Sequence, residues 1–147
     1  MKFYSLLLIA LLSVSCISTK STIQNIDNTA VHPKINEDKF QLTEYATSNK
    51  YGFDADYPVN IGIFNENQEK KQIAYFFNAL ESEKGERVLF EKIDTCCPFP
   101  TKNNTMGAGT LSIYEYNFEG TSTKGKLYFN IHEKGKVVCP NGFAIKK

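Results

Sequence analysis

The stretch from Asp94 to Thr110 constrains this chain most, because it brings adjacent cysteines, two prolines and two glycines into one short segment. Pro98 and Pro100 each remove a backbone donor and push the preceding residue out of the helical region. The segment therefore cannot be helical, and the sulfurs of Cys96 and Cys97 are held in a defined relation to each other. We expect a stiff loop that joins two strands and carries any sulfur chemistry of the domain.

Three interpretations of these cysteines remain open. In the first, Cys139 pairs with Cys96 or Cys97, which an oxidising compartment permits and which ties the loop to the C-terminal hairpin. In the second, Cys96 and Cys97 join each other in a small ring that distorts the intervening peptide and is comparatively easy to reduce. The third is a soft-metal site for zinc or cuprous copper, formed by Cys96, Cys97, Cys139 and His132. We favour the long-range structural disulfide and assign no metal or cofactor, since adjacent cysteines lack the usual chelating spacer.

The same segment gives little support to catalysis. A nucleophilic cysteine needs a neighbouring base and a setting that favours the thiolate. His132 is the histidine of the expected folded region, and nothing in the sequence places it beside the cysteines. We therefore assign no catalytic residue and do not expect an enzyme.

The N-terminal residues have the pattern of a targeting signal. Lys2 precedes the apolar run Phe3–Leu12, which is typical of a secretory signal peptide over residues 1–15. This run is well short of the roughly 20 residues needed to span a bilayer. Small residues directly before Cys16 resemble a bacterial lipobox, which predicts that Cys16 is lipidated and becomes the mature N-terminus. We expect a lipid anchor in the cell envelope, on the periplasmic face of the outer membrane.

Composition sets the domain organisation. Removal of residues 1–15 reduces the 17 basic residues to 16, equal to the 16 acidic residues, so there is no basic excess to neutralise nucleic-acid phosphates. Residues 16–39 are polar and predict a lipidated flexible tether. The remaining chain, 40–147, contains enough aromatic side chains for one core and has the length of a single domain.

One helix and several strands are predicted within that domain. Apolar residues recur at helical spacing between Asn67 and Leu80, and Asn65 with Gln68 has the pattern of a capping box. Apolar residues predict strands at 40–45, 59–63, 88–93, 111–118 and 126–132. The chain then turns into Val137 and Val138, and a tight bend at 139–142 precedes Phe143 and Ile145. The expected fold is α+β, an antiparallel sheet of about five or six strands with the amphipathic helix packed on one face.

Aromatic side chains predict a second candidate site on this sheet. The strand pattern allows four of them to share a face and to form a binding surface: Tyr114, Tyr116, Tyr128 and His132. The alternative interpretation is that they form a packing layer beneath another element.

Several short motifs resemble a known family, among them Tyr128-Phe129-Asn130 and Pro140-Asn141-Gly142-Phe143, and the most specific is Cys96-Cys97-Pro98-Phe99. Over residues 50–147 the chain resembles small uncharacterised lipoproteins of the Bacteroidetes, chiefly flavobacteria. Some members carry the name 2-dehydro-3-deoxyphosphooctonate aldolase. Such an aldolase resembles a barrel of eight strands and eight helices, which needs about 250 residues, so this name does not fit a chain with one predicted helix and five or six strands. The resemblance therefore implies a lipoprotein and brings no catalytic residues.

The sequence thus favours a lipid-anchored envelope module that binds an envelope protein or glycan without catalysis. The alternative function is a thiol-based redox or soft-metal-handling protein that uses Cys96 and Cys97.

Overall fold

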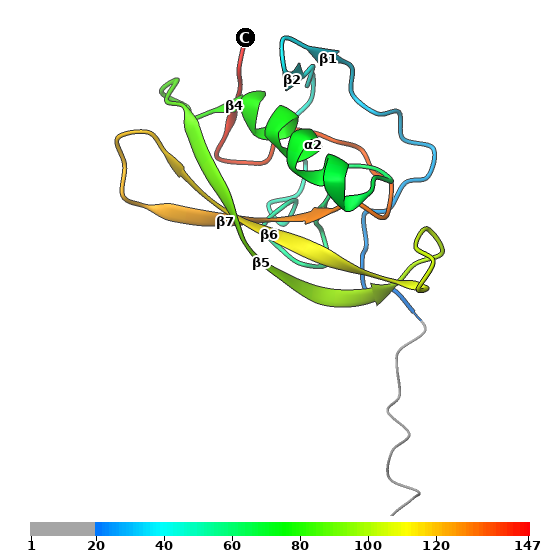
Figure 1. Ribbon diagram of the computed structural model, residues 1–147. Coiled ribbons are helices and arrows are strands. Elements are labelled where there is room, and N and C mark those ends of the chain that lie inside the picture. The colour runs from blue at the N-terminus through cyan, green and yellow to red at the C-terminus, as the bar shows by residue number, and fades with distance from the viewer. Residues whose placement is uncertain (1–19) are drawn as a thin grey trace, which may run out of the picture.

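The computed structural model describes residues 20–147 and consists of one helix and short and long strands (Figure 1). The predicted signal peptide and Cys16 lie outside the described residues. The elements are β1 (Ile35–Asn36), β2 (Lys39–Phe40), β3 (Val59–Asn60), α2 (Glu66–Asn78), β4 (Leu80–Glu81), β5 (Val88–Pro100), β6 (Ala108–Phe118), β7 (Lys124–Asn130) and β8 (Ala144–Ile145). Within residues 20–147, no helix is long and apolar enough to cross a membrane.

The main sheet has four strands in the order β3-β7-β6-β5. Strands β5, β6 and β7 form an antiparallel meander, but β3 pairs with β7 in parallel, with Val59 opposite Phe129. The general α+β class is confirmed, while the prediction of one antiparallel sheet of five or six strands is wrong. Two separate ribbons, β1-β2 and β4-β8, complete the strands, and neither β1 nor β4 was predicted. Of the strand predicted at 40–45, only Phe40 lies in a strand.

Helix α2 lies across one face of this sheet (Figure 1). It starts with the predicted capping box, in which the Asn65 side chain accepts from the Gln68 amide and the Gln68 side chain accepts from the Asn65 amide. Phe76 and Phe77 are buried, and their rings lie 5.3 and 5.4 Å from the ring of Phe129 on β7. The aromatic stripe is therefore the core of the domain.

The segment around the cysteines is a strand rather than a loop, which corrects the sequence expectation. Strand β5 continues through Cys96 and Cys97 to Pro100, and only residues 101–107 form the connection to β6. The prolines are tolerated because β5 is an edge strand, where one side of the backbone needs no sheet partner. One extra residue between Cys96 and Phe99 forms a bulge opposite β6.

The N-terminal arm, residues 20–40, also differs from the expected flexible tether. Ile23 is buried, and the Gln24 amide donates to the Asp56 carbonyl at 2.8 Å. Further along, the Asp27 amide donates to the Lys134 carbonyl, also at 2.8 Å. This arm is therefore part of the folded domain, because its backbone bonds to loops that are distant in sequence.

A buried asparagine network joins the arm to the sheet. Asn60 on β3 and Asn130 on β7 are 1% and 0% exposed, and Asn130 Nδ2 donates to Asn60 Oδ1 at 2.9 Å. Asn60 Nδ2 donates to the backbone carbonyl and the side-chain oxygen of Asn25, at 2.9 and 3.0 Å. Asn130 Oδ1 in turn accepts from the His132 amide. These bonds satisfy the polar groups that the parallel strand pair buries.

Candidate functional site

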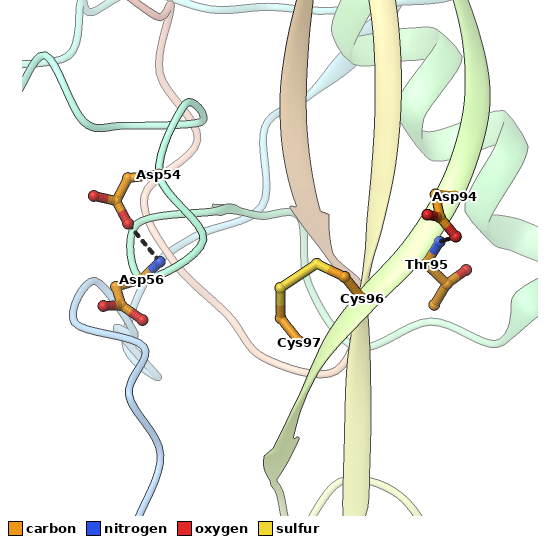
Figure 2. The surroundings of a disulfide bond; sticks show 6 residues. All are labelled: Asp54, Asp56, Asp94, Thr95, Cys96 and Cys97. Atoms are coloured by element: carbon orange, nitrogen blue, oxygen red, sulfur yellow. Dashed lines mark hydrogen bonds between the residues drawn. A yellow bond between two sulfur atoms is a disulfide. The ribbon is translucent and has the colours of Figure 1, made fainter.

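Cys96 and Cys97 form a disulfide with each other on β5, with Cα atoms 3.7 Å apart (Figure 2). The interpretation of a directly joined pair is therefore confirmed, and the favoured pairing with Cys139 is wrong. Cys97 has φ of 57°, which is unusual for a residue with a Cβ and is accommodated at the bulge. The bulge thus supplies the local backbone geometry that lets neighbouring cysteines meet.

The two halves of this disulfide differ in exposure. Cys96 packs against a small apolar cluster centred on Ile23, Phe99 and Leu111, whereas Cys97 is exposed. Figure 2 shows the sulfurs on the side of β5 that faces the loop bearing Asp54 and Asp56. Cys97 is therefore the half of the disulfide that is open to solvent.

Cys139 occupies a different environment. It is 0% exposed within the main core, and its Sγ lies 3.5 Å from the Phe143 carbonyl oxygen. Burial raises the pKa of the Cys139 thiol to about 12. It forms no disulfide with another cysteine of residues 20–147. A protonated thiol in this position acts as a small apolar side chain.

The soft-metal hypothesis is not supported by this placement. Within the described part of the chain, no three histidine, cysteine, aspartate or glutamate side chains gather as ligands. The predicted set of Cys96, Cys97, Cys139 and His132 is divided between an edge-strand disulfide, the main core and the end of β7.

The predicted aromatic surface is likewise divided. Tyr114 lies under the helix, where its hydroxyl approaches Glu69 Oε1 at 3.4 Å and its ring packs 5.4 Å from Phe129. Tyr116 packs against Phe143 on the same side of the sheet. Tyr128 belongs instead to the apolar cluster beside Cys96. The expectation that these tyrosines share one surface is wrong, because Tyr114 and Tyr128 occupy alternate faces of neighbouring strands.

The buried end of Tyr114 forms a polar contact between helix and sheet. Glu69 is 6% exposed and its Oε1 lies 2.9 Å from Lys92 Nζ on β5. Burial, together with the adjacent Glu69 charge, raises the pKa of the Tyr114 hydroxyl. The tyrosine therefore remains protonated and can donate to Glu69, which is a structural role.

His132 lies two residues beyond the end of β7, beside Phe99. Its ring packs edge-on to Phe99 with centroids 6.1 Å apart, directly over Gly109. Partial burial lowers the pKa of its imidazole, so the neutral form is favoured near pH 7. A Cβ at position 109 would lie 2.5 Å from His132 Cδ2, so the glycine is required for this close approach.

A cleft that was not identified from the sequence lies at the junction of the arm and the core. We call it the tyrosine cleft; its volume is about 330 Å³. Seven of its lining residues carry the argument below: Asn25, Asp27, Glu44, Tyr45, Thr47, Tyr57 and Lys136. Tyr45 is 54% exposed although it is a large aromatic side chain. The sequence carries no local signal for this cleft, because Asn25 and Asp27 of its lining belong to a segment whose composition predicts a tether.

Comparisons with known proteins gave no match to a protein-family model, a curated protein or a solved structure. The disulfide and the tyrosine cleft are therefore the two features from which a function is proposed.

Proposed function

We propose that this protein is a lipid-anchored component of the cell envelope and that its domain is a binding module without catalytic activity. The observation that carries the binding role is the tyrosine cleft, a concave site that combines an exposed aromatic ring with polar side chains. Three segments distant in sequence build it, around Asn25, Tyr45 and Lys136. The signal-peptide pattern, Cys16 and the resemblance to flavobacterial lipoproteins support the envelope location.

Lipidation at Cys16 would also orient the domain. Three residues lie between Cys16 and Lys20, where the described chain begins, so the two Cα atoms are at most about 14 Å apart in an extended chain. Lys20 lines a shallow depression together with residues 101–105 and Gly107 of the turn between β5 and β6. That turn would therefore face the bilayer, with Met106 presented to it at 86% exposure.

The binding role is tested with residues 16–147 carrying Cys16→Ser. Envelope material is separated into polysaccharide, lipid and protein fractions, and each is added while thermal unfolding is followed. We expect one fraction to raise the Tm of the protein and to lose this effect with Tyr45→Ala. Ile63→Ala, which removes another exposed apolar side chain outside the cleft, is the matched control and should respond like wild type. If no fraction raises the Tm, or Tyr45→Ala responds normally, the cleft is not the binding site.

The Cys96–Cys97 disulfide favours a second candidate function, a reversible thiol couple. The observation is the exposure of Cys97 at the protein surface. A dithiol reductant would attack Cys97 Sγ as a thiolate and break the bond, and Cys96 would leave as a thiolate and take up a proton. The second thiol of the reductant would then resolve the mixed disulfide and release Cys97 as a thiol, so that two electrons and two protons reach the protein.

This couple is tested by equilibrating the same protein in dithiothreitol redox buffers and counting alkylated thiols by mass spectrometry. We expect a single two-electron transition that adds two thiols, both mapped to Cys96 and Cys97, with the Tm changed by only a few degrees. Cys139 stays unlabelled under native conditions as an internal control. Reduction that requires unfolding would assign the bond a structural role and remove this second candidate.

A further inference from the structure

We propose that the tyrosine cleft binds a neutral saccharide, an inference that rests on the proposed binding function and names its ligand class. A sugar ring carries an apolar face of C–H groups and a rim of hydroxyls that both donate and accept. A site for it therefore needs an exposed aromatic ring beside fixed polar groups without a strong net charge. The tyrosine cleft meets each of these requirements.

The aromatic ring is already ordered. The backbone on both sides of Tyr45 is fixed, because the Cys139 amide donates to the Glu44 carbonyl at 2.9 Å and the Ala46 amide donates to the Cys139 carbonyl at 2.8 Å. The Tyr45 hydroxyl accepts from the Ile145 amide at 3.3 Å. The ring nevertheless remains 54% exposed, so it can pack on a sugar face with little loss of conformational entropy.

Asp27 supplies a fixed acceptor in the lining of the cleft. Its Oδ1 accepts from the Thr29 hydroxyl at 2.6 Å and from the Thr29 amide at 2.9 Å, and these bonds lower the pKa of the carboxyl group. Asp27 is therefore ionised at neutral pH, and Oδ2 is left to accept from ligand hydroxyls. Thr47, whose side chain is exposed in the cleft, adds a hydroxyl that can donate or accept.

The charges of the cleft select against ionic ligands. Lys136 Nζ is paired with Glu44 Oε2 at 2.6 Å, so the single lysine of the lining is neutralised by a neighbour. With Asp27 the lining carries one net negative charge, which opposes phosphorylated or carboxylated ligands. The alternative that this charge leaves open is an organic cation held by Tyr45 and Tyr57. The spare hydroxyl and acceptor positions favour the neutral polyhydroxylated ligand.

The test is an NMR titration of residues 16–147 carrying Cys16→Ser. The probes are glucose, galactose, mannose, N-acetylglucosamine and their disaccharides, with glucose 6-phosphate and choline as charged controls. We expect millimolar or tighter binding of at least one neutral sugar, with shifts confined to residues around Tyr45 and Asp27. Tyr45→Ala should weaken that binding about tenfold. Tyr45→Phe, which keeps the ring, should retain most of the affinity.

Asp27→Asn distinguishes a loss of the ligand acceptor from a loss of stability. The amide oxygen can still accept from Thr29, but the carboxylate oxygen Oδ2 is replaced by an amide nitrogen. We expect it to weaken sugar binding several-fold while the Tm remains near that of wild type, and Ile63→Ala should bind like wild type. Binding of choline alone, of glucose 6-phosphate in preference to glucose, or of sugars equally by Tyr45→Ala would overturn the proposal. If all sugars fail while a lipid or protein fraction still gives Tyr45-dependent stabilisation, the binding function stands and the saccharide assignment falls.

Discussion

Replacing Asn60 by alanine should lower the free energy of unfolding of the domain, because Asn60 is the centre of the buried asparagine network. The change removes the acceptor of the Asn130 Nδ2 donor and the donor to both oxygens of Asn25. Asn130 is 0% exposed, so water cannot replace its lost partner. Asn25 is only partly buried and can recover bonds to water.

The magnitude follows from this difference. One fully buried donor without a partner costs about 1–3 kcal/mol, whereas the Asn25 oxygens cost little once they are hydrated. Loss of packing around the shortened side chain adds about 1 kcal/mol. We therefore expect the free energy of unfolding to fall by about 2–4 kcal/mol, which corresponds to roughly 10 °C in Tm for a domain of this size.

Urea unfolding of residues 16–147 with Cys16→Ser measures this loss, and Asn67→Ala provides the matched control. Asn67 is exposed in the first turn of α2, so its replacement should change stability by less than about 0.5 kcal/mol. A double-mutant cycle between Asn60→Ala and Asn130→Ala should give a coupling above about 0.5 kcal/mol. Equal effects of Asn60→Ala and Asn67→Ala would refute the network as a source of stability.

Three further predictions follow from single contacts. Gly109→Ala should lower the free energy of unfolding by about 1–3 kcal/mol, since the new Cβ would lie 2.5 Å from His132 Cδ2; urea unfolding with an unchanged value would contradict this. The folded-state pKa of Cys139 lies above its ordinary value of 9.0, so its contribution is complete below pH 9 and should be lost between about pH 9 and 12. In that window the alkaline loss of stability should be smaller in Cys139→Ala than in wild type. The sequence contains no tryptophan, so the proposed anchoring at Cys16 can be tested with a fluorescent reporter. On vesicles carrying the protein acylated at Cys16, Met106→Trp should show blue-shifted fluorescence, whereas Lys84→Trp, before the other end of β5, should not.

The helix was predictable from sequence because its signals are local. Asn65, Gln68 and the apolar residues at helical spacing act within one or two turns, and the structure reproduces both the cap and the buried stripe. The α+β class follows from the same pattern. The parallel pairing of β3 with β7 was missed, because Val59–Asn60 is too short to indicate a partner and the pairing is between residues about 70 positions apart.

The cysteine segment shows how position in a sheet changes the meaning of a motif. Pro98 and Pro100 exclude a helix, as expected, but they also fit the outer edge of a strand. Whether a strand lies at an edge depends on the whole sheet and cannot be seen locally. The burial of Cys139 likewise depends on the whole fold. From sequence alone it was a possible disulfide partner, whereas the fold places its thiol among core side chains beside Phe143.

The N-terminal arm supplies part of the lining of the tyrosine cleft, which its sequence did not predict. Its composition is that of a linker, since polar residues dominate and apolar ones are isolated. Composition reports how much apolar side-chain surface a segment can bury, but it does not report the backbone and side-chain hydrogen bonds that the segment can form with distant loops. The arm is held chiefly through polar contacts at Gln24, Asn25 and Asp27, with Ile23 filling one apolar site. Because Asn25 and Asp27 also line the tyrosine cleft, the residues that fix the arm are the residues that complete the site. Loosening the arm should therefore weaken ligand binding before it unfolds the sheet, and Asn60→Ala allows both effects to be measured in one variant.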